Sequence, residues 1–330
     1  MNVSVCIPTY NQAPYIEKAI RSAFNQTHPP IEIIVSDDCS TDNTAEILQS
    51  LSNEIPILKI VHQSVNLGIS KNTDFCLRAA AGDYVLRLDS DDYLAPAYIE
   101  KLVGYFIDYP LTGYVHAAVQ EVDKNDNFLS IRRLARTSGF QTGEAALKAA
   151  VKGYRVAANI VMFRRTALEK VGFIAAETNF AEDYYLSASL ATEGFGNVYL
   201  DEILSYYRVW LDTGKVRQKR KLTEIIGIRK VFEEVIEPAF LKNGWGTASL
   251  KNRLTDFVCA HAVCLAWDIY SKDEKQELIT EFLKLSSGSK AKLFIWLYLH
   301  GYGKLVDVYT RIVSLPKIII KKVFLAVKSK

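Results

Sequence analysis

Short apolar runs alternate with longer segments of helical periodicity in the first part of the chain. The runs Val3–Ile7 and Ile31–Val35 are almost wholly apolar, as expected for strands that are buried on both faces of a parallel sheet. Between them, Tyr15–Phe24 carries its apolar residues at helical spacing. Repetition of this pattern gives the order β-α-β-α-β-α-β, which predicts an α/β fold with a mostly parallel sheet flanked by helices.

Three polar clusters follow the predicted strands, at Pro8–Asn11, Asp37–Asp42 and Asp89–Asp92. Sheets of this kind bind ligands beyond the carboxyl ends of their strands, so we expect the clusters to form one site. Asp89 and Asp91 are two residues apart on an extended segment, so their carboxylates can share a face and repel each other. A divalent ion such as Mg²⁺ or Mn²⁺ would relieve that repulsion. The alternative is an acidic loop whose aspartates cap a helix.

Composition and simple motifs exclude several classes of protein. The net charge of +3 over 330 residues is too small for nucleic acid to be the main partner. The sequence has no Gly-x-Gly-x-x-Gly after its first strand and no Walker-type loop, which argues against a dinucleotide oxidoreductase and a P-loop kinase. The five cysteines are scattered along the sequence, which fits reduced thiols in a cytosol. Cys6 and Cys76 are expected to be buried as small apolar residues. The sequence shows neither a signal peptide nor an apolar run that could span a bilayer, so we expect a cytoplasmic protein.

Four motifs together resemble those of the family 2 glycosyltransferases, namely Val5–Asn11, Ile34–Asp42, Asn66–Gly68 and Asp89–Asp92. The resemblance covers about residues 1–210 and implies a GT-A-type, Rossmann-like sheet, with a nucleotide-sugar-binding half (1–110) and an acceptor-binding half (111–211). From about Leu222 onward the sequence pattern is helical, so we expect residues 212–330 to form a basic loop and a helical C-terminal extension.

The activity implied by the resemblance is an inverting transfer of one sugar from a nucleotide diphosphate sugar, with UDP as the expected nucleotide. The acceptor would be a hydroxyl of a glycan or of a polyprenol-linked glycan in bacterial surface polysaccharide synthesis, and Mn²⁺ or Mg²⁺ would be the cofactor. The processive members carry membrane spans and a Gln-x-x-Arg-Trp motif, which this sequence lacks. Two alternatives remain open. One is a nucleotide-sugar-binding module without turnover, and the other is a sugar nucleotidyltransferase, whose Gly-rich basic N-terminal loop is missing.

The resemblance assigns the donor site to residues at the strand ends. Asp38 would accept the ring N–H of uracil, or else be a helix N-terminal acid. Lys71 would contact the base or the diphosphate, or else be an exposed helix lysine. Asp89 and Asp91 would bind the metal. The full set of expected nucleotide-binding residues is Pro8, Thr9, Tyr10, Asn11, Asp38, Asn66, Lys71, Asp89 and Ser90.

The acceptor side contains a pair of acids, Glu182 and Asp183, at the start of a predicted helix. Direct displacement at the anomeric carbon needs a base that takes the proton of the acceptor hydroxyl. The pair resembles the family's Glu-Asp motif, so Asp183 is the expected base and Glu182 a supporting residue. The alternative is that both acids only stabilise the helix N-terminus.

Cations in Tyr206–Trp210 and in the loop that follows it are expected to contact the diphosphate. Many relatives carry histidine where Trp210 stands. An indole N–H can only donate a hydrogen bond, so the third protein ligand of the metal is left open. Arg208, Lys215 and Arg217 would contact the diphosphate, the last two from a loop that closes over it and opens for release. The alternative is a solvated linker.

The remaining predictions concern secondary structure and the C-terminal region. Residues 114–122 and 128–131 should form a hairpin, 155–163 a strand and 257–267 a buried helix. Leu293–Tyr298 and Ile318–Phe324 mix bulky apolar side chains with lysines. Such segments would either contact the inner face of a bacterial membrane or pack on the catalytic domain or a second subunit, and both interpretations stay open.

Overall fold

The computed structural model describes residues 1–174, 180–210, 218–306 and 308. Contacts within the chain divide it into two units. The first unit consists of Met1–Gly214 and Lys230–Trp245, and contains the sheet. The second consists of Lys215–Arg229 and Gly246–Lys330, and its described residues are mainly helical.

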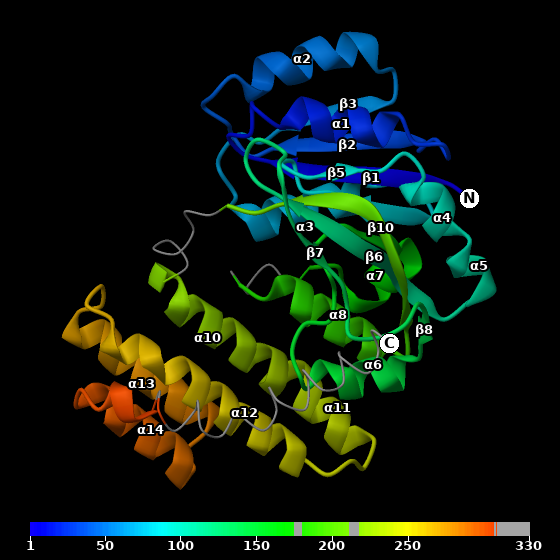
Figure 1. The fold of residues 1–330 in the computed structure, drawn as a ribbon. Helices are drawn as coiled ribbons and strands as arrows, with labels where there is room; N and C mark the ends of the chain where they lie inside the picture. The colour runs from blue at the N-terminus through cyan, green and yellow to red at the C-terminus, as the bar shows by residue number, and fades with distance from the viewer. Residues whose placement is uncertain (175–179, 211–217, 307, 309–330) are drawn as a thin grey trace, which may run out of the picture. The chain divides into compact units, whose positions relative to one another are not determined.

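A ten-stranded mixed sheet forms the centre of the first unit in the described part of the chain (Figure 1). Its strands are β1 (Val3–Thr9), β2 (Glu32–Asp37), β3 (Leu58–His62), β4 (Tyr84–Arg87), β5 (Tyr93–Leu94), β6 (Thr112–Val122), β7 (Phe128–Arg132), β8 (Gly139–Gln141), β9 (Val161–Arg164) and β10 (Gly196–Arg208). The order is β3-β2-β1-β4-β9-β6-β10-β5, with β7 beside β6 and β8 beside β10.

The two halves of the sheet differ in strand direction. Strands β1 to β4 run parallel, as the sequence predicts. Strand β9 is antiparallel to both β4 and β6, and β10 is parallel to β6. Strands β5 and β8 pair antiparallel with β10, and β7 with β6. The α/β fold is therefore confirmed, but the sheet is more mixed than the expected, mostly parallel one.

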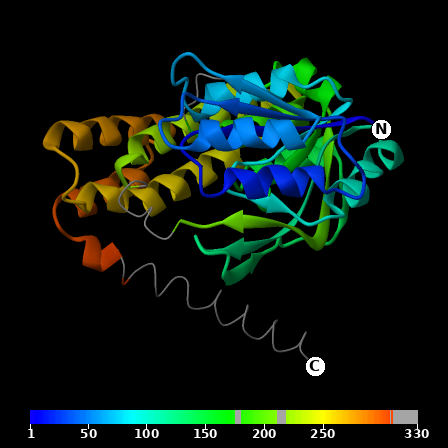
Figure 2. The same cartoon turned by 90° about the horizontal axis from the view of Figure 1, so that it is seen from above.

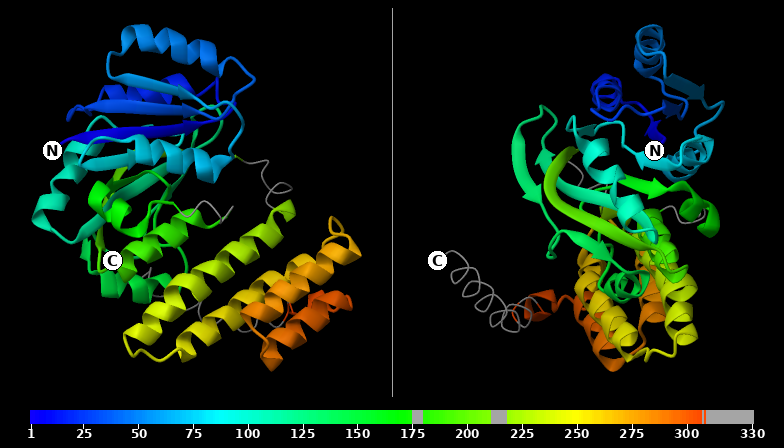
Figure 3. Two further views of the ribbon diagram at one scale, coloured as in Figure 1. Left: turned by 180° about the vertical axis from the view of Figure 1, so that it is seen from behind. Right: turned by 90° about the vertical axis from the view of Figure 1, so that its right-hand side faces the viewer.

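Helices of the first unit cover both faces of the sheet (Figures 2 and 3). They are α1 (Ile16–Phe24), α2 (Thr44–Glu54), α3 (Ile69–Ala79), α4 (Tyr98–Val103), α5 (Tyr105–Asp108), α6 (Gly143–Ala150), α7 (Arg165–Val171), α8 (Glu182–Thr192), a π-helical turn (Val231–Ile236) and α11 (Glu237–Lys242). Because every residue of β1 and β2 is buried, these strands need apolar side chains on both faces.

Alternate residues of one strand belong to two different cores. Val5 and Ile7 of β1 pack in the core that contains residues of α1, α2 and α4. Cys6, between them, packs in the core that contains residues of α3, α7 and α8, where Cys76 also lies. Both cysteines are buried, as predicted. Each fully buried Leu or Ile side chain contributes roughly 1.5–3 kcal/mol, so the two cores hold the strand ends in place.

Several boundaries differ from the sequence predictions. The expected strand over 155–163 is wrong for its first part, because β9 begins only at Val161. The residues before it, such as Ala157 and Ile160, are buried without being extended in the sheet, so their apolar character reflects burial alone. The hairpin is confirmed as β6 and β7, which pair antiparallel. Helix α7 ends with its C-cap at Gly172, which lies in the left-handed region at φ 79°.

The second unit contains α10 (Lys221–Lys230, whose last residue belongs to the first unit), α12 (Ala248–His261), a 3₁₀ turn (Ala262–Ala266), α13 (Lys272–Leu285) and α14 (Ser289–Leu299). Its core includes Val258, Leu278, Phe282 and Ile295. The segment 257–267 is only partly buried, because Ala260 and Ala266 are exposed. Among the residues that the structure describes, no helix is long and apolar enough to cross a bilayer.

Candidate functional site

The first two polar clusters meet at the carboxyl edge of the sheet. Asn11 follows β1 in the left-handed region, at φ 53°, which asparagine tolerates better than most residues. Its backbone N–H donates to Ser40 Oγ at 2.8 Å, and its Oδ1 accepts from the backbone N–H of Thr41 at 2.8 Å. The loops after β1 and β2 are therefore joined, as the topology argument predicts.

Asp38 is buried at this edge, with 2% of its surface exposed. Its Oδ1 accepts from the backbone N–H of Leu67 at 2.7 Å, and its Oδ2 from that of Gly68 at 2.9 Å. It is not a helix N-terminal acid, since α2 begins only at Thr44. Each carboxylate oxygen can accept a second hydrogen bond, so Asp38 keeps the capacity to accept from a donor such as a base N–H.

The other expected nucleotide-binding residues lie around the same loops. Thr9 is buried, and among the described residues its hydroxyl oxygen has no hydrogen-bond partner. Tyr10 is 46% exposed, and Lys71 is exposed in the first turn of α3. Asn66 donates from Nδ2 to the backbone oxygen of Asp38 at 3.1 Å. The others, Pro8 and Ser90, are buried in β1 and in the acidic turn after β4.

Three carboxylates crowd the turn after β4. Burial raises the pKa of Asp92 well above its usual range, and the charges of Asp91 and Asp89 raise it further. Burial and the charge of Asp89 also raise the pKa of Asp91, while the hydrogen bond from Trp210 opposes that rise. Asp92 Oδ1 accepts from the backbone N–H of Arg208 at 2.7 Å, whereas its buried Oδ2 has no partner among the described residues.

This donor set fits a hard divalent cation that takes few protein ligands. The described residues contain no group of three or more His, Cys, Asp or Glu side chains that could hold a metal ion. Asp89 and Asp91 would supply carboxylate oxygens, and the remaining positions of Mg²⁺ or Mn²⁺ would be taken by diphosphate and water. A cation there would offset the mutual repulsion that raises the pKa of Asp91.

Arg87 joins the acidic turn to the start of α8. It is the last residue of β4 and is 3% exposed. Its Nε donates to Asp89 Oδ1 at 3.0 Å, and its Nη1 donates to Asp183 Oδ1. The expected base and the expected metal ligand therefore share one buried guanidinium, although they are far apart in the sequence. Arg87 was not among the residues expected from the sequence.

The pKa of the Asp183 carboxyl is raised to about 6. Burial is the largest cause, since the side chain is only 17% exposed, and the charges of Glu182 and Asp89 act in the same direction. Arg87 opposes them by stabilising the ionised form. A pKa near 6 leaves the carboxylate ionised at neutral pH and still able to accept a proton, which suits a general base.

Arg208 is held by internal partners and is 2% exposed. Its Nε donates to the backbone oxygen of Asp91 at 2.9 Å, Nη1 to that of Asp123 at 2.6 Å, and Nη2 to Asp126 Oδ1 at 2.7 Å. The side chain fastens the end of β10 to the acidic turn and to the β6–β7 hairpin. Its contact with a diphosphate stays a prediction.

Trp210 lies at the acidic turn, where its Nε1–H donates to Asp91 Oδ2 at 2.7 Å. Its ring contacts that of Tyr15 edge to face, with 5.6 Å between ring centroids. The indole therefore contacts a proposed metal ligand rather than acting as one. Lys215 and Arg217, expected in the closing loop, lie outside the described residues.

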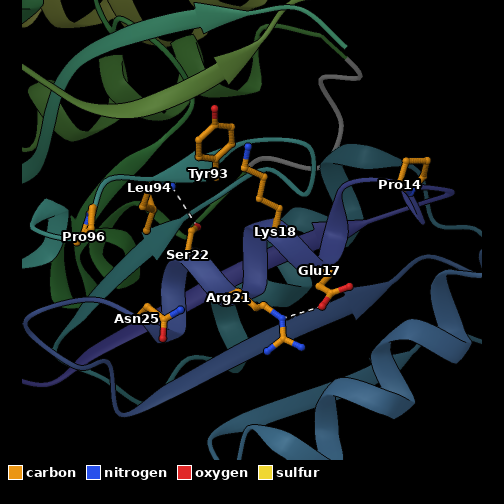
Figure 4. A pocket seen from close by; sticks show the side chains of 9 residues that line it. All are labelled: Pro14, Glu17, Lys18, Arg21, Ser22, Asn25, Tyr93, Leu94 and Pro96. Atoms are coloured by element: carbon orange, nitrogen blue, oxygen red, sulfur yellow. Dashed lines mark hydrogen bonds and ion pairs between the residues drawn. The ribbon is translucent and has the colours of Figure 1, made fainter. Parts of the chain in front are cut away.

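A separate hollow of about 530 Å³ lies along α1 (Figure 4). Lys18 and Tyr93 line it, with the ammonium 3.6 Å from the ring centroid. Ser22 Oγ accepts from the backbone N–H of Leu94 at 3.1 Å and fixes the short strand β5 to α1. None of the expected site residues that the structure describes lines this hollow.

Comparison with known proteins settles the family. A family model described as "Glycosyl transferase family 2" matches residues 4–172, about half of the chain. The chain belongs to this family. The "Putative teichuronic acid biosynthesis glycosyltransferase TuaG" of Bacillus subtilis is 31% identical to this family 2 glycosyltransferase over 211 residues, which are 63% of this chain and 79% of that protein.

Other relatives are much longer than the segment that they share with this chain. The "Chondroitin synthase" of Escherichia coli is 34% identical over 128 residues, 39% of this chain but only 18% of that protein. The chain therefore matches less than a fifth of the length of this relative.

Two solved structures share the fold of this family 2 glycosyltransferase. S. aureus TarS 1-349 in complex with UDP has a TM-score of 0.57 at 22% identity, with 91% of this chain and 92% of that one covered. The mannosyltransferase PcManGT from Pyrobaculum calidifontis, in complex with GDP-Man and Mn²⁺, has a TM-score of 0.55 at 20% identity, with 93% and 86% covered. The predicted glycosyltransferase fold and family are both confirmed.

Proposed function

We propose that the protein transfers one sugar, with inversion, from a UDP-sugar to a hydroxyl of a glycan or polyprenol-linked acceptor in bacterial surface polysaccharide synthesis. The observation that carries the proposal is the guanidinium of Arg87, which is hydrogen-bonded to both Asp89 and Asp183. A nucleotide diphosphate held at the acidic turn would therefore lie near the carboxylate that accepts the acceptor's proton. The name of the TuaG relative supports the polysaccharide setting.

The reaction is a single displacement. The acceptor oxygen attacks the anomeric carbon while the bond between that carbon and the diphosphate oxygen breaks, and the bonding electrons leave with the diphosphate. The hydroxyl proton passes to the carboxylate of Asp183, whose pKa of about 6 makes it an ionised base at neutral pH. Attack opposite the leaving group inverts the anomeric configuration.

The residues of the chain divide the remaining tasks. Asp89 and Asp91 would hold Mn²⁺ or Mg²⁺, which when bound supplies Lewis-acid stabilisation of the diphosphate. Arg87 keeps Asp183 ionised despite its burial, because a nearby cation favours the charged form of a carboxyl. Glu182 adds negative charge beside Asp183 and raises its basicity.

The donor side uses the loops after β1 and β2. Asp38 would accept the uracil N–H on oxygens that already bind the loop before α3. Thr9 is the last residue of β1, and its buried hydroxyl oxygen has no hydrogen-bond partner in the described part of the chain. TarS was solved with UDP and with UDP-GlcNAc, and PcManGT with GDP-Man, which supports a nucleotide sugar as the donor class. We assign residues 1–110 to the donor and 111–211 to the acceptor.

Ligand-dependent thermal stability tests this assignment. We expect UDP-sugars to raise the melting temperature more with Mn²⁺ than without it, and more than GDP- or dTDP-sugars do, because binding to the folded state stabilises it by mass action. A product whose anomeric configuration is opposite to the donor's, measured by NMR, would establish inversion. Metal-independent stabilisation would contradict the proposed cation. Stabilisation without turnover on any acceptor would favour a nucleotide-sugar-binding module instead.

Membrane contact through the C-terminal helices, at the inner face of the membrane, stays a proposal. Exposed apolar side chains recur along the end of the second unit, namely Leu293, Trp296, Leu299, Tyr302, Leu305 and Val308. Such side chains suit either a bilayer interface or a second subunit. The segment Ile318–Phe324, which was expected to extend this surface, lies outside the described residues.

A further inference from the structure

A basic cavity lies on the acceptor half of the first unit, apart from the residues assigned to the donor. Its volume is about 470 Å³, within the range of sites that bind small molecules. Four of its lining residues are cations, Arg136, Lys148, Lys152 and Arg155, and no acidic residue is among those that line it. The rest of the lining is neutral, with Leu134, Ala135, Gln141 and Ala149. We name this site the basic cavity.

Two of its cations have no carboxylate partner within the part of the chain that the structure describes. Among the described residues, neither Arg136 nor Arg155 forms an ion pair, whereas Arg132 and Arg133 nearby pair with Glu121 and Asp201. The guanidinium of Arg136 donates to the neutral side-chain amides of Gln141 and Asn197. Its charge is thus held in place but not neutralised.

Arg136 is also partly buried, and this burial affects the pKa of its guanidinium. Desolvation lowers the pKa of its guanidinium, which means that burial disfavours its charge and that no nearby acid reverses the effect. The guanidinium also lies 5.5 Å from the centroid of the Tyr199 ring. Such a fixed, partly desolvated guanidinium binds anionic ligands well, because its N–H groups donate to phosphate or carboxylate oxygens in a matching geometry.

The wall of the basic cavity is connected to the helix that carries Asp183. Arg155 follows Tyr154, and the charge of Asp183 raises the pKa of the Tyr154 hydroxyl in addition to the larger effect of burial. Tyr184, the neighbour of Asp183, donates from its hydroxyl to the backbone oxygen of Ala150, next to the lining residue Ala149. The segment that lines the cavity is therefore held against the first turn of α8.

We propose that the basic cavity binds an anionic group of the acceptor, a phosphate or a carboxylate set back from the hydroxyl that receives the sugar. This rests on the proposed transfer reaction and specifies its acceptor as a negatively charged glycan or glycan phosphate. The cations would fix the direction in which the chain enters the site and would exclude neutral glycans of the same length.

Binding of three probes tests the proposal, and each probe differs in the charge it carries. They are neutral chitotetraose, a hyaluronan tetrasaccharide with carboxylates, and an oligo(glycerol phosphate) with phosphodiesters. We expect an anionic probe to bind at least about tenfold more tightly than chitotetraose at low salt, and the preference to shrink at high salt. The tighter of the two anionic probes identifies the group.

Matched variants show whether the basic cavity is responsible. K152Q/R155Q changes two exposed side chains and should remove most of the preference, and R136K should weaken it while keeping the charge. R133Q is the control, since Arg133 is an exposed arginine of the same region that pairs with Asp201 outside the cavity. Equal affinity for neutral and anionic probes, equal loss in R133Q, or binding of none of the probes would overturn the proposal.

Turnover of UDP-sugar in the same preparations separates this inference from the proposed function. Turnover without any charge preference would refute the basic cavity as a subsite and leave the transfer reaction standing. Charge-selective binding without turnover of any nucleotide sugar would refute the transfer reaction and leave the anion site standing.

Discussion

The ionisation of Asp183 predicts how activity depends on pH. With a pKa of about 6, the carboxyl is roughly nine-tenths ionised at pH 7 and roughly one-tenth ionised at pH 5. The structure therefore predicts that kcat/KM falls about tenfold between these pH values, because only the ionised form can take the acceptor's proton. An aspartate with an ordinary pKa near 3.9 would stay largely ionised at pH 5 and show almost no loss.

The fall in kcat/KM toward low pH is the acid limb of the pH profile. Substitution of Arg87 tests whether the ionisation of Asp183 causes this limb. In R87K a compact ammonium replaces the two-armed guanidinium that reaches both Asp89 and Asp183. Because Arg87 lowers the pKa of Asp183, weakening the contact should raise that pKa and move the acid limb to higher pH. R87M removes the cation and should move the limb further. It should also destabilise the fold by about 3–5 kcal/mol, as loss of one partner of a buried ion pair does.

The dependence of kcat/KM on pH is measured from initial rates of nucleotide release in mixed buffers of constant ionic strength. R133K is the control, because it makes the same change at an exposed arginine that pairs with Asp201. Its limb should coincide with that of the unaltered protein. An acid limb near pH 4 in the unaltered protein, or an R87K limb that stays in place or moves to lower pH, would refute the assignment of the limb to Asp183.

Three further predictions concern single contacts. Trp210→Phe removes the N–H that donates to Asp91, so the pKa of Asp91 should rise further. More Mn²⁺ should then be needed for half-maximal donor binding at pH 6, and an unchanged requirement in a manganese titration would contradict this prediction. Asp38→Ala removes the acceptor of the backbone N–H of Leu67 and leaves that of Gly68 with Asn66 Oδ1 at 3.1 Å, which should cost about 1–3 kcal/mol in urea unfolding. The substitution should also abolish stabilisation by UDP, and retention of that stabilisation would exclude Asp38 as the residue that binds the uracil. Ser271→Ala removes the N-cap of α13 and should cost about 1 kcal/mol in urea unfolding without changing donor affinity, so a loss of donor binding would contradict it.

The parallel part of the sheet was predictable because its sequence pattern has a simple physical cause. Strands such as β1 are buried on both faces, so apolar runs mark them, and chain topology then places their polar ends at one edge. The contact between Asn11 and the loop after β2 follows from that argument.

Strands in the second half do not follow such a simple pattern. Strand β10 carries Asp201 and Glu202 in its middle, and register shifts near Ile203 break its alternation of apolar and polar residues. Strand β5 has only two residues, too few for any periodicity. The apolar residues before β9 are buried in irregular backbone, so hydrophobicity predicted burial there but not extended structure.

Arg87 was missed because its partner Asp183 lies 96 residues away in the sequence. A signal was nevertheless present. Arg87 ends a strand whose other residues are apolar, and a charged side chain that is buried there is stabilised by a partner such as a carboxylate. The basic cavity was missed for a similar reason, since Arg136 and Arg155 lie on separate segments that only the fold brings together.

The most direct test of the central claim is sugar transfer by Asp183→Asn with a UDP-sugar and Mn²⁺. Because asparagine keeps the shape of the side chain but cannot accept the proton, donor affinity should stay within about twofold while transfer falls by about 10²–10⁴-fold. Transfer at an undiminished rate would contradict the account, because the proton would then leave by another route.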